Sequence, residues 1–173
     1  YDSMIAKLIV HGRDRNDAIA KMREALNGFV IRGVSSNIPF QAALLAHPQF
    51  VSGQFNTGFI AEHYSHGFQA DHVPHADPDF LVALAAYVHR RVRERAALLG
   101  GQLQGHRMVV GEHFVVRALG QDGRHAQYPV QVTGFNDESG ECQVVVGTSR
   151  YELESSWRLG EIRVQGSVNG RPF

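Results

Sequence analysis

The sequence lacks several features that would point directly to a class of function. It holds a single cysteine, Cys142, so no disulfide can form within the chain, which suits a reducing compartment. Acidic and basic residues balance at 17 each, so no net charge draws the chain to nucleic acid or to an anionic membrane. It has no apolar run of about 18 residues, the length that a membrane-spanning helix needs. We therefore expect neither nucleic acid nor a membrane as partner.

The composition that remains is that of a folded protein. Hydrophobic residues make up 43% and charged residues 20% of the chain. Its length of 173 residues is enough for one ordinary domain or two small ones. The chain begins with Tyr1 instead of methionine and stops at Phe173, soon after the turn-forming pair Asn169-Gly170. We expect the chain to be a fragment of a longer protein.

Residues 1–64 have the pattern of a small α+β unit. An apolar run broken only by Lys7 predicts a strand near the start, and Asp14 is a suitable N-cap for an amphipathic helix that includes Ala18 to Leu26. The His47-Pro48 step favours the end of a later helix. The remaining predicted elements are a strand over 29–31, a helix over 38–46 after Asn37, and a helix over 58–64 after Thr57.

Residues 65–76 break this pattern and predict a linker. Four histidines lie in or beside it, and their i, i+3 pairs could bind zinc. The segment has no cysteine and an irregular composition, so we favour solvent-exposed histidines and predict no metal site. These histidines are His63, His66, His72 and His75.

A long helix is predicted to begin at Asp77-Pro78, a capping aspartate followed by proline. Residues 80–88 (FLVALAAYV) are almost entirely apolar, which predicts a helix that is buried on every side. The next residues, 89–95 (HRRVRER), are basic, and helical spacing spreads their arginines around the axis. We expect a solvated or partner-contacting end rather than a nucleic-acid site, with Gly100-Gly101 ending the helix.

The residues after the helix read as antiparallel strands. Phe114, Val116 and Ala118 alternate with polar or outward positions, as do Tyr128, Val130 and Val132. Further strands are predicted over 142–146, 151–153 and 162–164. One buried helix followed by such strands predicts a sheet that closes around the helix as a barrel, which would also remove exposed edges.

Four single residues invite sharper hypotheses. Ala20-Lys21-Met22 faintly resembles a biotin acceptor site, but Lys21 falls on the predicted helix, which favours a solvated lysine. Lys7, in an apolar run, is expected to form a structural ion pair. Cys142 is expected to be a buried structural thiol. Trp157 is expected to anchor a strand end in the core, with an interface role left open.

Several ordered blocks resemble the end of the C-terminal subdomain of biotin carboxylases. They are residues 1–10 (YDSMIAKLIV), 33–40 (GVSSNIPF), 47–50 (HPQF) and 57–60 (TGFI). From Phe68 onward the chain resembles the linker-and-barrel region of the propionyl-CoA carboxylase α-subunit family. The resemblance implies an α+β chain in three parts: the end of a biotin carboxylase domain (1–64), a linker (65–76), and a helix with an antiparallel β-barrel (77–173) that is incomplete.

The resemblance also implies a chemistry that lies outside this chain. The parent enzyme of the family is a ligase that carboxylates biotin with ATP, bicarbonate and Mg or Mn, and then carboxylates an acyl-CoA, here propionyl-CoA. No catalytic, cofactor-binding or metal-binding residue of the family maps onto a residue here, so the chain alone should be inactive. The expected location is the cytoplasm in a bacterium, or the mitochondrial matrix in a eukaryote.

The expected partners are the carboxyltransferase β subunit and the other parts of the α subunit. The resemblance places a connection to the β subunit in residues 99–111 (LGGQLQGHRMVVG). The alternative is a free-standing barrel that binds a ligand or a metal, although an apolar helix inside the barrel would fill the cavity. The predicted contact residues are Gln102, Leu103, Gln104, His106, Arg107 and Met108.

Overall fold

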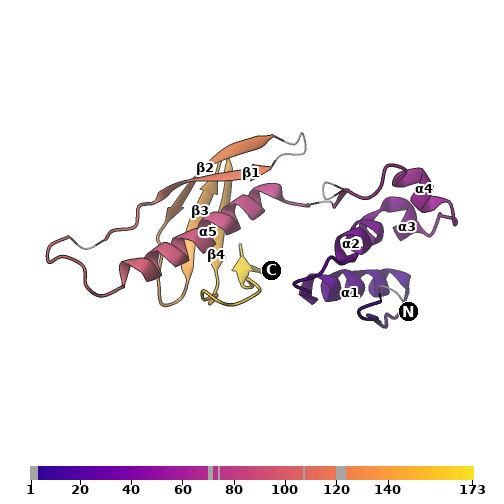
Figure 1. Cartoon of the computed structure of the whole chain (residues 1–173), viewed down its shortest axis with the longest axis horizontal. Coiled ribbons are helices and arrows are strands. Elements are labelled where there is room, and N and C mark those ends of the chain that lie inside the picture. Colours follow the sequence, from indigo (N-terminus) through magenta and orange to yellow (C-terminus); the bar gives the residue numbers. More distant parts are fainter. Residues whose placement is uncertain (1–3, 70–71, 74, 107, 120–123) are drawn as a thin grey trace. The chain divides into compact units, whose positions relative to one another are not determined.

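The computed structural model describes residues 4–69, 72–73, 75–106, 108–119 and 124–173. The chain divides into two compact units, Tyr1–His75 and Ala76–Phe173 (Figure 1). The first contains helices α1 (Arg15–Gly28), α2 (Ile38–Ala46), α3 (Pro48–Ser52) and α4 (Phe59–His63). The described residues of the second unit form one helix and six antiparallel strands, which confirms the α+β class.

Local capping explains where the helices of the first unit begin. Asp14 caps α1 as predicted, because its carboxylate accepts a hydrogen bond from the backbone N–H of Asp17 at 2.9 Å. His47-Pro48 ends α2 as predicted and also starts α3, a helix that the sequence pattern missed. The cap of α4 is Gly58 and not Thr57.

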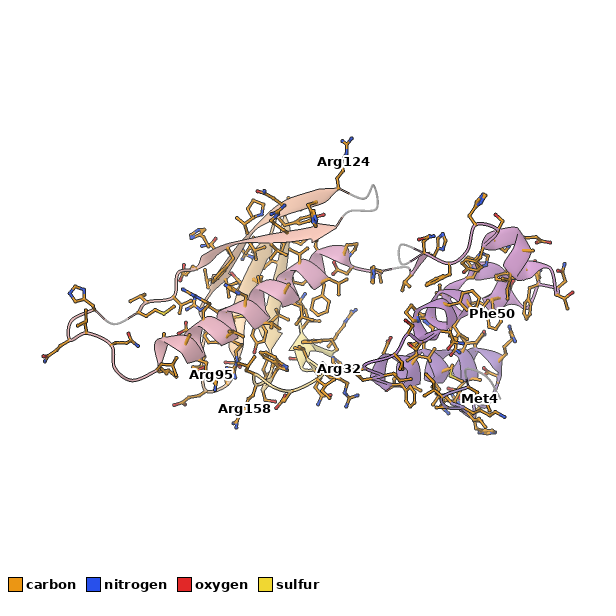
Figure 2. The ribbon with its side chains drawn as sticks, viewed as in Figure 1. Met4, Arg32, Phe50, Arg95, Arg124 and Arg158 are labelled. Carbon is orange, nitrogen blue, oxygen red and sulfur yellow. The ribbon has the colours of Figure 1, made fainter. Side chains whose placement is uncertain are left out.

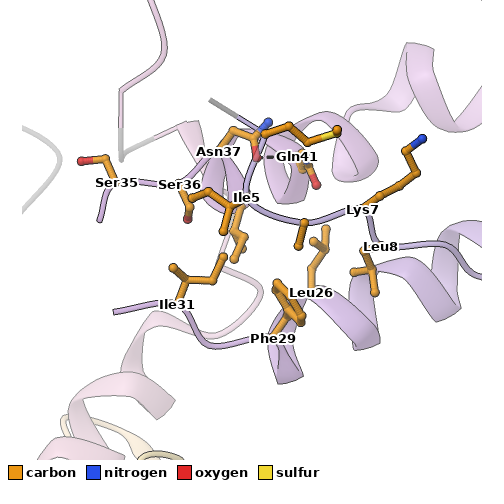
Figure 3. Close-up of a pocket in the computed structure, with 13 residues that line it drawn as sticks. Ile5, Lys7, Leu8, Leu26, Phe29, Ile31, Ser35, Ser36, Asn37 and Gln41 are labelled. Atoms are coloured by element: carbon orange, nitrogen blue, oxygen red, sulfur yellow. Dashed lines mark hydrogen bonds between the residues drawn. The ribbon is translucent and has the colours of Figure 1, made fainter. Parts of the chain in front are cut away.

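The two strands predicted in the first unit are absent from its described residues. Residues 4–10 and 29–31 are extended or irregular, and Met4, Ile5 and Ile9 are exposed. Residues 4–8, Phe29 and Ile31 border a groove of about 710 Å³ between this segment, the end of α1 and the start of α2 (Figure 3). Their apolar pattern suits a strand, but a strand forms only where a neighbouring strand takes up its backbone hydrogen bonds.

The second unit is a six-stranded meander in which each strand pairs with the next along the chain. The strands are β1 (His113–Leu119), β2 (His125–Thr133), β3 (Glu141–Val146), β4 (Ser149–Glu154), β5 (Ser167–Val168) and β6 (Arg171–Pro172). Val144 of β3 lies opposite Val132 of β2 and Tyr151 of β4, so their side chains share one face. The predicted alternation in β1 and β2 is confirmed.

Helix α5 (Pro78–Ala97) packs across that face, and side chains fill the layer between the helix and the strands (Figure 2). Asp77 caps it as predicted by accepting from the Phe80 N–H at 3.1 Å, and it also accepts a hydrogen bond from the Tyr151 hydroxyl at 2.8 Å. Within the described residues no helix has the length and apolar character needed to cross a bilayer. The core consists of Val82, Ala83, Ala86, Tyr87, Val130, Val132, Cys142, Val144, Val146, Tyr151 and Leu153.

The prediction that α5 is buried on every side is wrong. Ala83 and Ala86 are buried at 0% and 1% exposure, whereas Leu81 is 45% exposed and Ala85 is also exposed. The sheet does not close into a barrel, so it covers only one side of the helix. An apolar composition on all sides permits a helix to be buried all round. Only a closed sheet would cover every side of it, and the sheet here is open.

The end of the chain also differs from expectation. Residues 162–164 form no strand, and Ile162 is exposed; the pairing with β4 is made by β5 instead. Asn169 and Gly170, with φ angles of 49° and 75°, make the two-residue turn predicted for this pair. A short second strand, β6, follows it, so the turn is a complete hairpin.

The two neighbouring alanines of α5 give a matched test of this packing. Ala86→Asp should lower the free energy of unfolding of the second unit by several kcal/mol, because it places an unpaired charge against the sheet. Ala85→Asp adds the same side chain on the exposed side and should cost only about 0.5 kcal/mol in helix propensity. Chemical denaturation of both variants measures the difference, and equal losses would contradict the one-sided packing of α5.

The buried thiol of Cys142 predicts a loss of stability at alkaline pH. Burial raises its pKa to about 12, against a smaller opposing effect of Arg90. Because the unfolded chain loses this proton at lower pH, near 9, the folded state is progressively disfavoured as the pH rises from about 9 to about 12. Cys142→Ala should lose less unfolding free energy than the unsubstituted chain over this range, in denaturation series at stepped pH. If the unfolding free energies of the two proteins fell equally with pH, the raised pKa of the buried Cys142 thiol would be contradicted.

Candidate functional site

The loop between α5 and β1, residues 98–112, carries four strongly exposed apolar side chains. It leaves the end of α5 and projects beyond the sheet before it returns to β1 (Figure 1). Leu98, Leu99, Leu103 and Val109 are 61%, 63%, 77% and 87% exposed. Such a concentration of apolar side chains on one loop is typical of a surface that another protein covers.

One side chain connects the start of this loop to its far arm. The amide nitrogen of Gln102 donates hydrogen bonds to the carbonyl oxygens of Ala97 at 2.6 Å and Leu99 at 3.0 Å, at the end of α5. Its amide oxygen accepts a hydrogen bond from the backbone N–H of Met108 at 2.7 Å. The tip between these points turns through a hydrogen bond from the His106 N–H to the Leu103 carbonyl at 3.0 Å. Gln102 therefore connects the start of the loop, at Ala97 and Leu99, to its returning arm at Met108.

The returning end of the loop is attached to α5 as well. Arg90 donates a hydrogen bond to the carbonyl oxygen of Gly111 at 2.9 Å and forms an ion pair with Glu94 at 2.5 Å. Its guanidinium also lies over the ring of Phe135, 5.2 Å from the centroid. Both ends of the loop are thus fixed to the same helix.

The arginine run of α5 is only partly solvated. The side chains of Arg90 and Arg91 are 11% and 13% exposed, and Arg91 donates to the carbonyl oxygens of Trp157 and Asp137. Arg93 and Arg95 are exposed, and Arg95 lies on the last turn of α5 (Figure 2). The expectation of a solvated end is therefore wrong for the first two arginines, since the C-terminal half of the helix still lies against the sheet.

The predicted contact residues fall into three groups. Leu103, Gln104 and His106 are exposed on the tip of the loop, where a partner could reach them. Gln102 is engaged within the chain, and Met108 is half-buried. Arg107 lies outside the described residues. Leu98, Leu99 and Val109 were not among the predicted contact residues, although Leu99 and Val109 lie within the predicted segment 99–111 and two consecutive leucines follow the last helical turn.

The loop also encloses a shallow groove of about 340 Å³ beside the end of α5. Its walls combine apolar side chains with backbone at two glycines. The lining residues are Ala96, Leu99, Gly100, Gly101, Gln102, Leu103, His106 and Met108.

The linker histidines do not converge on one point. His63 contacts the side-chain oxygen of Gln49 at 2.6 Å, and His72 accepts a hydrogen bond from the Gln69 N–H at 2.9 Å. His66 and His75 are exposed. Among the described residues, no three histidine, cysteine, aspartate or glutamate side chains are placed to hold a metal ion.

One of these histidines, His63, lies beside His47 in the first unit. The rings of His47 and His63 are 4.4 Å apart between centroids. Burial lowers the pKa of His47, and the proximity of His63 lowers it further. The Nδ1 atom of His47 accepts from the Gln49 N–H at the start of α3, which is a structural role.

Neither lysine is placed to carry biotin. Lys21 lies within α1, pairs with Asp17 at 3.2 Å and donates to the carbonyl oxygen of His11 at 3.0 Å. A biotinyl lysine needs the exposed tip of a hairpin turn, so Lys21 does not fit. Lys7 is exposed, its amine points away from the groove (Figure 3), and the ion pair expected for it is absent from the described residues.

The remaining singled-out residues belong to the core of the second unit. Cys142 and Trp157 are both 7% exposed, as predicted for structural residues, and the Trp157 indole donates to the Glu161 carbonyl at 3.3 Å. Ala83, Ala86 and Tyr87 cover the inner face of the sheet. They occupy the space in which the ligand of a free-standing binding barrel would lie.

Comparison with known proteins divides the chain at the same place. Residues 1–62 match the family model described as biotin carboxylase C-terminal domain, and residues 81–173 match the propionyl-coenzyme A carboxylase BT domain. The propionyl-CoA carboxylase alpha chain of Ruegeria pomeroyi is 35% identical over the whole chain, and the mitochondrial alpha chain of Mus musculus is 29% identical over 98% of it. Biotin carboxylase 1 of Bacillus subtilis is 57% identical over 35% of the chain.

These relatives are much longer proteins. The chain spans 24% of the Ruegeria alpha chain, 23% of the mouse alpha chain and 13% of the Bacillus biotin carboxylase.

Proposed function

Because the chain belongs to the family of biotin-dependent carboxylase alpha chains, joining a biotin carboxylase C-terminal domain to a propionyl-CoA carboxylase BT domain, we propose that its second unit docks a carboxyltransferase β subunit. The α5–β1 loop is the docking element. Its contact residues are Leu98, Leu99, Leu103, Gln104, His106 and Val109, with Met108 at their edge.

The observation that carries this proposal is the exposure of Leu98, Leu99, Leu103 and Val109 on a loop that is held at both ends. Exposed apolar side chains gain free energy when a partner removes them from water, at about 25 cal/mol per Å². A loop that is already ordered loses less conformational entropy on binding than a flexible one. Apolar surface and order together support a role in stable assembly.

The chemistry of the proposed parent enzyme takes place elsewhere in the assembly. Biotin and ATP serve the parent enzyme, with propionyl-CoA as the acyl acceptor, and the described residues here supply neither a biotin-bearing lysine nor a metal site. The proposed contribution of residues 77–173 is positional, with 1–64 completing the biotin carboxylase domain and 65–76 connecting the two. Holding carboxylase, biotin carrier and transferase in one assembly raises the effective concentration of the carrier at each active site.

The two leucines on the loop provide the direct test. Replacing Leu99 and Leu103 together with serine should weaken binding to the cognate β subunit roughly a hundredfold, because two apolar side chains no longer become buried. The melting temperature should change by less than about 2 °C, since both side chains are exposed in the free chain. Binding is measured by biolayer interferometry on the immobilised chain, and the melting curve by calorimetry.

The matched control replaces Leu159 and Ile162 with serine. These residues are 55% and 58% exposed in the same unit but lie outside the loop, so binding should be unchanged. If the control weakens binding and the loop variant does not, the docking surface lies near residues 159–162. If neither variant weakens binding, the α5–β1 loop is not the docking element.

A further inference from the structure

We infer that Gln102 is a positioning residue that orders the α5–β1 loop for docking, and not one of the residues that touch the partner. This inference rests on the function proposed above for the loop. It reverses the role that the family resemblance implied, in which Gln102 was one of several contacting side chains.

The three hydrogen bonds of Gln102 engage both its amide nitrogen and its amide oxygen. The N–H donations go to the carbonyls of Ala97, the last residue of α5, and of Leu99, and the oxygen accepts from the N–H of Met108. The last carbonyls of a helix have no partner within the helix, so the donation to Ala97 also caps α5. With donors and acceptor engaged inside the chain, Gln102 has little left to offer a partner.

The loop needs such a brace because its backbone is permissive. Gly101 and Gly105 have φ angles of 84° and 82°, a region that side chains disfavour, and no atom lies within 4 Å of the position of an added Cβ. Glycine at these points allows the turn but does not hold it. Gln102 connects the start of the loop to Met108, so the tip that carries Leu103 is closed by a side chain and not by packing.

The geometry accounts for the arrangement of the exposed residues. Leu99 precedes the brace, Leu103 lies on the tip that it closes, and Val109 directly follows its far attachment at Met108. Closing the loop at Gln102 therefore restrains the backbone that carries these three exposed side chains. Opening it would raise the conformational entropy that docking must overcome.

The test compares Gln102→Ala and Gln102→Met with Gln104→Ala in the whole chain. Gln104 is an exposed glutamine on the same tip, and its side chain has no hydrogen bond among the described residues. Two quantities are measured: hydrogen–deuterium exchange of the Met108 amide in the free chain by NMR, and binding to the cognate β subunit. Both Gln102 variants should speed Met108 exchange at least about tenfold and weaken binding roughly tenfold, as expected for lost hydrogen bonds.

Further variants separate this inference from the docking proposal. Gln104→Ala should leave Met108 exchange unchanged, and Gln102→Glu, which keeps only an acceptor, should fall between glutamine and alanine in both measurements. In the Leu99→Ser, Leu103→Ser variant, binding should fall while Met108 exchange stays unchanged. Thus, if that leucine variant binds normally, the docking proposal fails although the brace can still be seen in the exchange rates.

Three results would overturn the inference about Gln102. Unchanged Met108 exchange in Gln102→Met would show that the side chain does not hold the loop. Faster exchange with unchanged binding would show that the order of the loop has no part in docking. A fall in binding without faster exchange would return Gln102 to the set of contact residues.

Discussion

The buried hydroxyl of Tyr87 is the interaction on which the second unit most depends. Its ring is fully buried between α5 and the sheet, and its oxygen lies 2.7 Å from the carbonyl oxygen of Ser155 and 3.0 Å from that of Gly140. One hydroxyl thus serves as a shared donor to carbonyl groups before β3 and after β4, and the Gly140 carbonyl also accepts a hydrogen bond from the Ser155 N–H at 3.4 Å. Gly140 is required here, because an added Cβ would lie 2.0 Å from the Ser155 oxygen. Helix and sheet are therefore held in one relative position.

That fixed position is what gives the α5–β1 loop a defined place on the unit. Arg90 and Arg91, about one turn beyond Ala86, hold the second half of α5 through Gly111, Asp137 and Trp157. The loop then begins and ends on the same helix. Apolar side chains can stay exposed on such a segment because neither the helix nor the loop can turn to bury them.

Local sequence signals predicted much of this fold, and non-local contacts account for what they missed. Capping by Asp77, the alternation in β2 and the turn at Asn169-Gly170 depend on neighbouring residues, so the sequence pattern was sufficient. The exposed side of α5 at Ala85 depends on whether the sheet closes, which no helical pattern encodes. The place of the candidate loop was predictable from its glycines and from the family resemblance. The role of Gln102 was not, because it depends on bonds that form only when the loop folds back.

The central claim, that the α5–β1 loop is the docking element, is tested most directly by hydrogen–deuterium exchange of the chain with and without the cognate carboxyltransferase β subunit. The account predicts that exchange in residues 98–112 slows at least about tenfold on binding, because the partner covers backbone that is exposed in the free chain. The backbone amides of β1 to β4 should exchange at an unchanged rate. Slower exchange confined to those strands, with residues 98–112 unaffected, would contradict the account.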